Sequence, residues 1–274
     1  FTPPSVGVYA STVTVNYTSG GVARSVSMNL SGQGTIAAAL SISDGVTYSF
    51  GTKVLGSSTD KTLTVTNAGG LAATAMAGSG LAAPFTFKGG AYPGTGGTCG
   101  VTVASLATCT MVVTYAPTTA GAGSDQIVLA YHDGTATTST TRDLQGTGQG
   151  LAALTISDGP TYNYGNEVVG STPAEKIFTV SNGAGLATAT ALAGAGLAAP
   201  FDYKDGAYPG TGGNCGATLA GGASCTIVVT YRPLAAAAHS DSIEIGYHDG
   251  SATVTALRGV QGTGVAPSTL VISD

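Results

Sequence analysis

Apolar and polar residues alternate along most of the chain in short runs. Leu40-Ser-Ile-Ser, Lys61-Thr-Leu-Thr-Val-Thr and Phe85-Thr-Phe-Lys all have a period of two, which is typical of β-strands with one buried and one solvated face. Longer, more apolar runs of the same kind lie at 110–115 and 126–131. No stretch keeps a period of 3.6 residues, so few helices are expected. The pattern predicts an all-β protein.

Turn signals separate these runs. Asp44-Gly45 and Asp133-Gly134 are typical of tight turns, because glycine adopts a positive φ without steric cost. About seven or eight short strands with turns at this density indicate a sandwich of two antiparallel sheets.

The first half of the chain returns in the second half. Residues 40–148 reappear as residues 154–264, and the run Ala-Tyr-Pro-Gly-Thr-Gly-Gly at 91–97 is identical at 207–213. Near the other end, Leu270-Val-Ile-Ser-Asp274 repeats the first strand of this unit. Such self-similarity is typical of tandem repeats. We therefore expect the C-terminal part of a preceding Ig-like repeat at 1–36, Ig-like repeats at 37–150 and 151–266, and the first strand of a following repeat at 267–274.

Aromatic residues recur at the same places in the two whole repeats. We expect these rings to build each hydrophobic core, because burying large rings dominates core energetics. Phe1 and Tyr17 extend two of the positions into the partial copy. Short linkers are expected at 145–153 and 261–268, which contain glycine but no long flexible tract. The matched aromatic positions are Tyr48, Phe50, Phe85, Phe87, Tyr92, Tyr115 and Tyr131 with Tyr162, Tyr164, Phe201, Tyr203, Tyr208, Tyr231 and Tyr247.

Composition narrows the classes of function. The 274 residues include 43 glycines, and 43% are hydrophobic, which argues against disorder. The net charge is −5 and the nine Lys and Arg residues are scattered, so there is no basic stripe for a nucleic acid. No apolar run approaches the roughly 20 residues needed to span a bilayer. We expect neither nucleic acid as a partner nor a membrane span in this segment.

Each whole repeat carries two cysteines ten positions apart, Cys99 and Cys109 in one, Cys215 and Cys225 in the other. They flank a predicted turn, so they can face each other across neighbouring strands at disulfide distance. An even count with one pair per repeat implies an oxidising compartment. Zinc is the competing interpretation, but it needs four ligands and no histidine lies close in sequence to either pair. We predict two disulfides, no metal and no cofactor.

The sequence around the cysteines resembles a known family. The stretch Cys-Gly-Ala-Thr-Leu-Ala-Gly-Gly-Ala-Ser-Cys-Thr-Ile-Val-Val-Thr-Tyr-Arg-Pro at 215–233, with its other copy at 99–117, is similar to bacterial choice-of-anchor D repeats. These are relatives of the ASPM–SPD-2–Hydin (ASH) Ig-like domains. The resemblance covers nearly the whole chain. It implies tandem Ig-like antiparallel β-sandwich repeats in large secreted or surface-anchored bacterial proteins, mostly as a spacer or scaffold and without catalytic residues.

Two His-Asp pairs are the most site-like features, His132-Asp133 and His248-Asp249. A histidine beside an aspartate could be a base with its orienting partner, or a metal-binding pair. However, Asp-Gly between alternating strands first indicates a hairpin turn, and the partial copy has Thr18-Ser19 at this place. No nucleophile motif accompanies the pairs. We therefore expect turns here and no enzyme.

Other acidic and basic residues suggest weaker hypotheses. Asp44 and Asp158 could contribute to calcium sites where repeats join, but nearby acids are sparse and calcium needs several oxygen ligands. Lys61 and Lys176 invite comparison with the lysines of isopeptide-crosslinked adhesin domains, yet the closing strands offer no obvious asparagine. We expect neither a calcium site nor an isopeptide bond.

The leading hypothesis is a structural segment of an extracellular or surface-bound bacterial fibre, stalk or surface protein. Its partners would be neighbouring repeats of the same chain and sister chains in a fibre. The rival hypothesis is an adhesin-type module that contacts a glycan or protein through glycine-rich loops, since loops at the ends of sandwiches often carry function. The loop residues that would bind, or would join domains, are Tyr92, Pro93, Gly94 and Thr95 with Tyr208, Pro209, Gly210 and Thr211.

Overall fold

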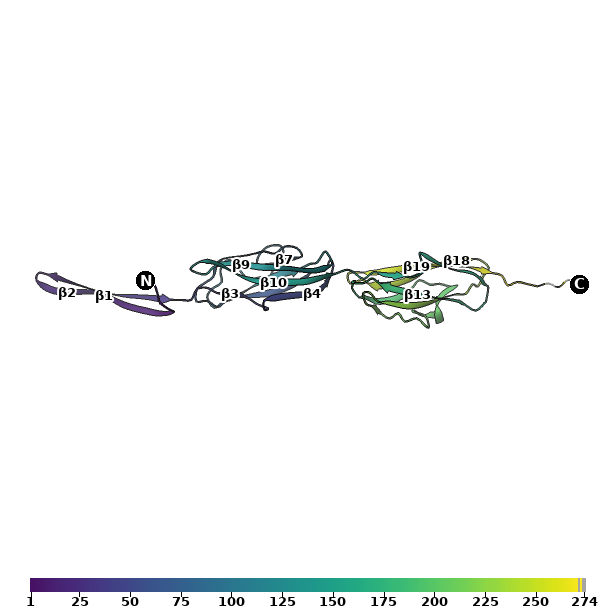
Figure 1. Ribbon diagram of the computed structural model, residues 1–274, viewed down its shortest axis with the longest axis horizontal. Coiled ribbons are helices and arrows are strands. Elements are labelled where there is room, and N and C mark those ends of the chain that lie inside the picture. The colour runs from purple at the N-terminus through teal and green to yellow at the C-terminus, as the bar shows by residue number, and fades with distance from the viewer. Residues whose placement is uncertain (271, 273–274) are drawn as a thin grey trace. The chain divides into compact units, whose positions relative to one another are not determined.

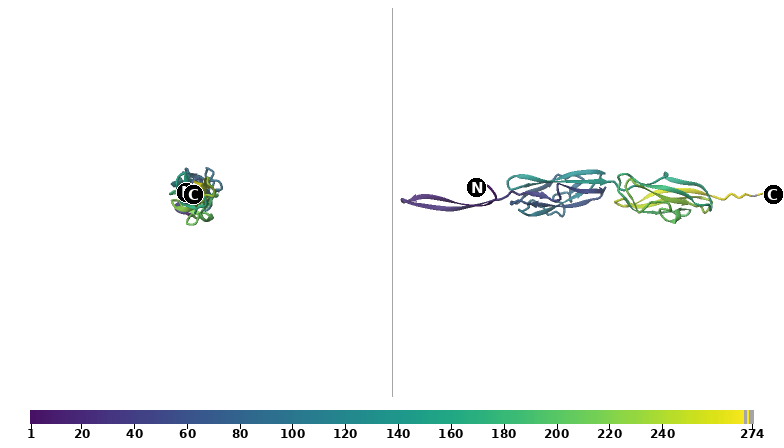
Figure 2. Two further views of the ribbon diagram at one scale, coloured as in Figure 1. Left: turned by 90° about the vertical axis from the view of Figure 1, so that its right-hand side faces the viewer. Right: turned by 60° about the horizontal axis from the view of Figure 1, so that its bottom comes forward.

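The computed structural model describes residues 1–270 and 272. Regular structure in this part of the chain is β-strand apart from one 3-10 turn, η1 (Lys204–Gly206), as Figures 1 and 2 show. Of the strand predicted at 267–274, residues 271, 273 and 274 lie outside the described residues. The chain forms two compact units, Phe1–Gly51, Ser58–Ala116 and Ala122–Gly146 in the first, and Thr52–Ser57, Pro117–Gly121 and Thr147–Asp274 in the second.

The chain begins with a hairpin of two long strands, β1 (Gly7–Ser19) and β2 (Val22–Gly34), paired antiparallel along their whole length. Gly20 and Gly21 form the two-residue turn with φ of 60° and 81°. A two-residue hairpin turn of this kind requires a positive φ at both positions, which favours glycine.

Residues 40–149 form a β-sandwich. One sheet has the strand order β3-β5-β8-β7 and the other β4-β10-β9-β6. The alternating runs of the sequence supply these strands, so that Leu63 and Val65 point into the core while Thr62, Thr64 and their neighbours lie at the outer face. The strands are β3 (Leu40–Ile42), β4 (Thr47–Val54), β5 (Thr59–Asn67), β6 (Thr74–Ser79), β7 (Phe85–Phe87), β8 (Thr108–Tyr115), β9 (Gly121–His132) and β10 (Thr137–Gln149).

Residues 154–265 form a second sandwich with the same plan. Its sheets have the orders β11-β13-β17-β15 and β12-β19-β18-β14-β16. Most pairs are antiparallel, whereas β12 runs parallel to β19. The strands are β11 (Leu154–Ile156), β12 (Thr161–Val168), β13 (Ala174–Asn182), β14 (Ala189–Ala195), β15 (Phe201–Tyr203), β16 (Thr218–Leu219), β17 (Ser224–Tyr231), β18 (Ala238–His248) and β19 (Thr253–Val265). The predicted fold class, an all-β chain of Ig-like sandwiches, is confirmed.

Each sandwich has its own core between its two sheets. In the first, Phe85 and Tyr115 stack with ring centroids 4.8 Å apart, and in the second Phe201 and Tyr231 stack at 4.7 Å. Phe178, which has no aromatic match, is fully buried where the first sandwich has Leu63. The recurring aromatic residues of the whole repeats therefore contribute to the cores.

One expectation from the sequence is wrong, and two matched aromatic residues lie outside the described cores. Phe1 and Tyr17 are 81% and 48% exposed, and no second sheet packs on the hairpin in the described part of the chain. The linkers predicted at 145–153 and 261–268 begin later than expected, since β10 continues to Gln149 and β19 to Val265. Their Gly-Thr-Gly sequences form strand, with glycines where neighbouring groups approach the backbone.

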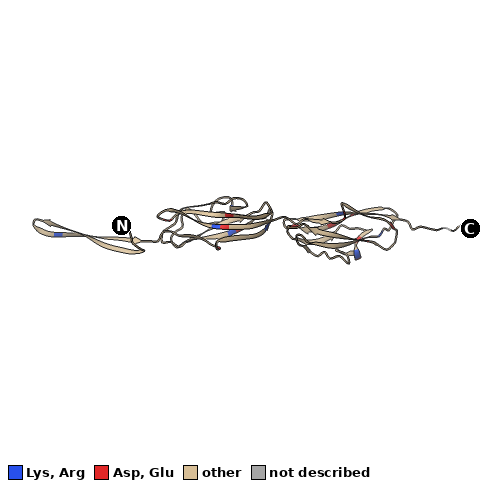
Figure 3. Ribbon diagram, viewed as in Figure 1, with Lys and Arg blue, Asp and Glu red and all other residues tan. Residues whose placement is uncertain are grey.

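Charged residues are few and scattered along the ribbon of both sandwiches and the hairpin (Figure 3). This agrees with the nine basic residues of the sequence. The described residues contain no helix long and apolar enough to cross a membrane.

Candidate functional site: the disulfide and the glycine-rich loop

In each repeat a disulfide joins the beginning of a strand, β8 in the first and β17 in the second, to a segment that precedes it in the chain. Cys99 and Cys109 are bonded with their Cα atoms 4.8 Å apart, and Cys215 and Cys225 with theirs 4.9 Å apart. All four side chains are buried. The prediction of one disulfide in each repeat is therefore confirmed, and no cysteine is left for a zinc site.

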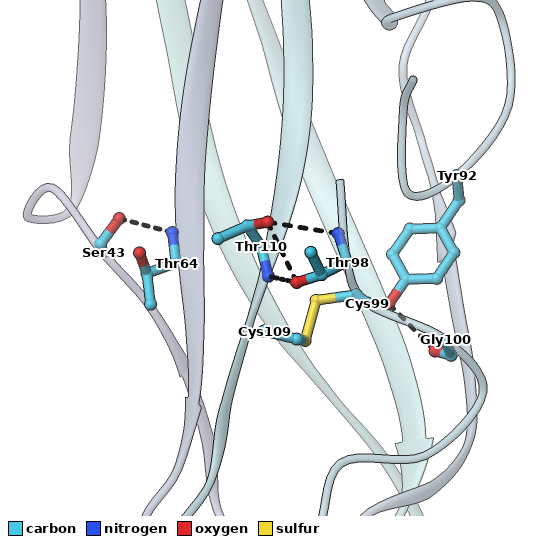
Figure 4. The surroundings of a disulfide bond; sticks show 8 residues. All are labelled: Ser43, Thr64, Tyr92, Thr98, Cys99, Gly100, Cys109 and Thr110. Carbon is cyan, nitrogen blue, oxygen red and sulfur yellow. Dashed lines mark hydrogen bonds between the residues drawn. A yellow bond between two sulfur atoms is a disulfide. The ribbon is translucent and has the colours of Figure 1, made fainter. Parts of the chain in front are cut away.

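Hydrogen bonds between Thr98 and Thr110 join the same two segments beside the disulfide (Figure 4). We call this pair of residues the threonine clamp. The amides of Thr98 and Cys99 donate to the carbonyl oxygen of Thr110 at 2.8 and 3.0 Å, and the amide of Thr110 donates to Oγ1 of Thr98 at 2.9 Å. In the second repeat Asn214 replaces Thr98, and its Oδ1 accepts from the amide of Thr226 at 2.7 Å. The clamp survives this change of residue because both side chains present an oxygen acceptor.

The glycine-rich loop between β7 and the disulfide covers the outer edge of β8. The amide of Val112 donates to the carbonyl oxygen of Pro93 at 2.8 Å, and the amide of Lys88 donates to the carbonyl oxygen of Val112 at 3.0 Å. β7 and the loop together thus provide hydrogen-bond partners for the backbone groups at this edge of β8 along most of its length. An open edge would offer unpaired backbone groups to another strand, so this loop closes the sheet.

Glycine is required in this loop for two reasons. Gly94 has a φ of 88°, and a Cβ there would collide with the carbonyl oxygen of Val112. Gly210 has a φ of 84° and the same relation to Val228. The identical Pro-Gly-Thr-Gly-Gly runs are therefore explained by close backbone approach to the strand.

Tyr92 is half-buried and packs against Phe87 at the margin of the core. The two rings meet edge to face with centroids 5.7 Å apart, and the Tyr92 ring lies over Gly78, where a Cβ would clash with it. The hydroxyl donates to the carbonyl oxygen of Gly100 at 3.5 Å (Figure 4). Burial raises the pKa of Tyr92. Tyr208 packs in the same way on Tyr203, at 5.6 Å.

The part of the loop that is exposed is smaller than the sequence indicates. Pro93 is half-buried and Gly94 is buried, while Thr95 and Gly96 are exposed. In the second repeat Pro209 is likewise half-buried and Gly210 buried, while Thr211 and Gly212 are exposed. A ligand in solution would therefore reach the loop mainly through its threonine tip, and the binding role of the loop stays a prediction.

The His-Asp pairs form turns in both repeats. Nδ1 of His132 accepts from the amide of Gly134 at 3.1 Å, and Oδ1 of Asp133 accepts from the amides of Thr135 and Ala136 at 2.7 Å. These bonds, with Ala136 contributing most, lower the pKa of Asp133 to about 2. His248 and Asp249 make the same bonds in the second repeat. One polar atom of each side chain, Nδ1 of the histidine and Oδ1 of the aspartate, is thus bonded to the turn itself.

Asp44 and Lys61 form an ion pair that sequence reasoning did not connect. Nζ of Lys61 lies 2.7 Å from Oδ1 of Asp44 and 4.6 Å from the ring centroid of Tyr48. The bond from Lys61, followed by the one from Ser43, lowers the pKa of Asp44. Asp44 lies in the turn after β3, and Lys61 lies on β5, which pairs with β3. The two residues are therefore close in space although they are far apart in the sequence. No cluster of His, Cys, Asp or Glu suited to a metal ion is present among the described residues.

Two polar residues at matched places in the repeats were also missed. Asn67 is fully buried and bonds five backbone groups of the loops around it, including the amide of Ala39 and the carbonyl oxygen of Leu71. Arg142 is buried and donates to the carbonyl oxygen of Ile42. In the second repeat, Asn182 is buried and bonds three such groups, and the half-buried Arg258 donates to the carbonyl oxygen of Ile156. An asparagine and an arginine recur at matched positions of the two repeats, and this recurrence in the sequence could have identified them.

Comparisons with known proteins do not show a family for this chain. No family model and no curated protein matches the sequence. Among solved structures, the chain is similar to the ASH / PapD-like domain of human CEP192, with 17% identity, 41% of this chain and 86% of that chain covered, and a TM-score of 0.31. It is similar to protocadherin gamma B7 extracellular cadherin domains 1–4, with 8% identity, 89% and 55% covered, and a TM-score of 0.47. It is also similar to the YadV chaperone, with 12% identity, 80% and 98% covered, and a TM-score of 0.28.

Proposed function

We propose that this chain is a structural segment of an extracellular bacterial fibre, stalk or surface protein, in which disulfide-stapled Ig-like repeats act as a semi-rigid spacer. The observation that carries the proposal is the duplication of internal bonds. Both repeats use their cysteines, His-Asp pairs and glycine-rich loops for the same contacts within the sandwich. Duplicated residues that stabilise the fold are what a spacer requires. The proposal includes no catalytic activity.

The motif around the cysteines supports a finer assignment. We propose that the repeats are of the choice-of-anchor D type, on the strength of the sequence from Cys215 to Pro233 and its copy from Cys99 to Pro117. The disulfides favour an oxidising compartment, which agrees with a secreted or surface location.

The spacer is tested by the distance between its two sandwiches. Spin labels at Thr62 and Ile177, exposed positions at matched places in β5 and β13, give a distance distribution by pulsed electron spin resonance. A semi-rigid spacer gives one narrow distribution that is unchanged by salt. A broad distribution would contradict the spacer, because flexible linkers sample many separations.

The rival function is an adhesin-type module that uses the exposed tip of the glycine-rich loop. The double substitution Thr95→Ala and Thr211→Ala removes the exposed hydroxyls while leaving Tyr92 and Tyr208 in place. Binding to bacterial or host cells and to a glycan array is compared with the unchanged chain. Loss of binding at unchanged melting temperature would favour the module, whereas equal binding, or none in either protein, would favour the spacer.

A further inference from the structure

The first strand of each sandwich is held by a short backbone ladder. β3 pairs with β5 at three residue positions, and β11 pairs with β13 at three residue positions. Leu40 and Ile42 are buried in the core, while Ser41 between them is exposed. The ladder alone therefore provides few bonds for a strand whose side chains belong to the core.

Side chains from the opposite sheet bind the other edge of this strand. The backbone groups of Leu40 and Ile42 point away from β5, since only alternate residues of an antiparallel strand bond to a given neighbour. The amide of Leu40 donates to the hydroxyl of Tyr131 on β9 at 3.2 Å. Arg142 on β10 donates to the carbonyl oxygen of Ile42. The first strand is thus joined to both sheets of the sandwich.

The second sandwich has the same two side-chain bonds. The amide of Leu154 donates to the hydroxyl of Tyr247 on β18 at 3.1 Å, and Arg258 on β19 donates to the carbonyl oxygen of Ile156. β19 is the last strand of this sandwich, as β10 is the last strand of the first. In both sandwiches an arginine of the last strand therefore binds the first strand directly.

Equilibrium stability is a weak reason for an arginine at this place. Nε of Arg142 and Nε of Arg258 are buried and have no hydrogen-bond partner among the described residues. A buried polar group without a partner costs stability, and replacing buried charged groups by well-packed apolar residues is often neutral. A guanidinium does, however, form a strong and directed bond to its acceptor. The recurrence of the arginine therefore points to a role for the bond itself.

Tension along the chain enters each sandwich at its first strand and leaves it at its last strand. β12, which follows the first strand β11, runs parallel to β19. Pulling the two ends draws β12 and β19 in opposite directions along their axes, so the bonds between them are loaded together instead of one after another. The first strand has only its three-residue ladder and comes before this pair in the chain. It is therefore the part of the sandwich that needs a further connection under load.

We propose that the sandwiches bear tension along the chain, and that Arg142 and Arg258 pass it from the first strand of each sandwich to the last. The bonds of Tyr131 and Tyr247 hold the beginning of the same strand. This inference deepens the spacer role and rests on it, because a fibre or stalk fixed at both ends is loaded along its length. With both bonds in place, the first strand leaves its sheet only when contacts in both sheets break.

The test is single-molecule force spectroscopy of the full chain held by its two ends. Each sandwich that unfolds should lengthen the chain by about 300 Å, the extended length of its residues outside the disulfide loop. Arg142→Met should raise the unfolding rate at a fixed force about tenfold in one of the two unfolding events, through loss of a hydrogen bond to a charged group. The event of the second sandwich is the internal control and should not change. Arg258→Met should change that event alone, and the double variant should change both.

A second attachment point separates an effect on load from an effect on stability. Pulling between Thr62, which is exposed on β5, and the C-terminal end loads the first sandwich without loading β3. A label that does not react with cysteine keeps the disulfides intact. In this direction Arg142→Met should leave the unfolding rate of the first sandwich unchanged.

Tyr131→Phe gives a second variant that removes a single hydroxyl from the core. It should raise the unfolding rate of the first sandwich about two- to tenfold when the chain is pulled by its ends. Pulling from Thr62 should show no change. This variant carries the test if Arg142→Met does not fold.

Two outcomes would overturn the proposal. The first is an unchanged unfolding rate under end-to-end pulling in Arg142→Met, or in Tyr131→Phe where the arginine variant does not fold. The second is an equal rise of the rate in both pulling directions, which would mean that these side chains only stabilise the fold. Neither would touch the spacer function, which is measured without force by the distance between residues 62 and 177.

Discussion

The hairpins β1–β2 and β9–β10 have the same pattern of side chains but different surroundings. Val15 is 55% exposed, while its match Leu129 is fully buried. Local packing is nevertheless shared, since the ring of Phe1 lies against Gly32 as the ring of Tyr115 lies against Gly146. The strand register and the ring-on-glycine contact follow from nearby sequence. Burial does not, because it requires a second sheet from elsewhere in the repeat.

This difference predicts very unequal effects of matched substitutions. Leu129→Ala should lower the free energy of unfolding of the first sandwich by about 2–5 kcal/mol, because it leaves a cavity in a packed core. Val15→Ala should change it by about 0.5 kcal/mol or less, because the side chain is exposed. Differential scanning calorimetry at low protein concentration measures both. An equal loss in the two variants would show that Val15 is covered in solution.

The disulfides distinguish the sandwiches from the hairpin, which contains no cysteine. Replacing Cys99 and Cys109 by serine should cost the first sandwich about 2–3 kcal/mol, through the ten-residue loop that the bond closes. The same change at Cys215 and Cys225 should act on the second sandwich alone. Calorimetric transitions report each sandwich, and amide chemical shifts of β1 and β2 should not move. A change in those shifts would contradict the separation.

A tyrosine recurs at the same place in the hairpins β1–β2, β9–β10 and β18–β19. Substituting it should give a smaller difference in stability between the first hairpin and the sandwiches. Tyr131→Phe removes the acceptor for the amide of Leu40, so it should destabilise the first sandwich by about 0.5–1.5 kcal/mol. Tyr17→Phe should have no effect on the melting temperature at low concentration. Faster hydrogen exchange at the Leu40 amide in the first variant would identify the bond as the cause, and unchanged exchange would argue against it.

The smallest effect concerns stability in acid, because Asp133 lies at the surface, only half-buried, and solvent screens its hydrogen bonds. Its pKa of about 2 in the folded sandwich lies below the ordinary value of 3.8. Between these values the unfolded chain binds more protons, so the contribution is present above about pH 4 and is lost as the pH falls towards 2. The hairpin has Ser19 at this place and no such dependence.

Asp133→Asn keeps the oxygen acceptor but does not titrate. The loss of melting temperature of the first sandwich between about pH 4 and pH 2 should therefore be smaller in this variant than in the unchanged chain. Asp249→Asn is the matched control, since it should reduce the acid dependence of the second sandwich only. An identical pH profile in Asp133→Asn and the unchanged chain would refute the assignment.

Much of the fold could be predicted from the sequence because alternation and turns are local signals. The Asp44-Gly45 turn has the positive φ values that the dipeptide favours, and the cysteines pair as their spacing predicts. β6 (Thr74–Ser79) was not foreseen. Its sequence, Thr-Ala-Met-Ala-Gly-Ser, has little difference between its faces, and its place in the sheet depends on β9.

The candidate site was less predictable, since its contacts join distant residues. Composition suggested an open glycine-rich loop, whereas Gly94 is buried against Val112 and completes the edge of a sheet. The pairing of Lys61 with Asp44 depends on strand register. Tyr17 could not be placed correctly from its pattern alone, because exposure is decided by whether another sheet covers it.

The position of the cysteines also bears on how a chain of similar repeats folds. Similar neighbours can exchange strands and misfold during synthesis. Cys109 is ten residues from its own partner and about ten times farther along the chain from the cysteines of the next repeat. Closing the longer loop costs about 2 kcal/mol more in chain entropy. Oxidation therefore favours the local bond over a bond between cysteines of different repeats.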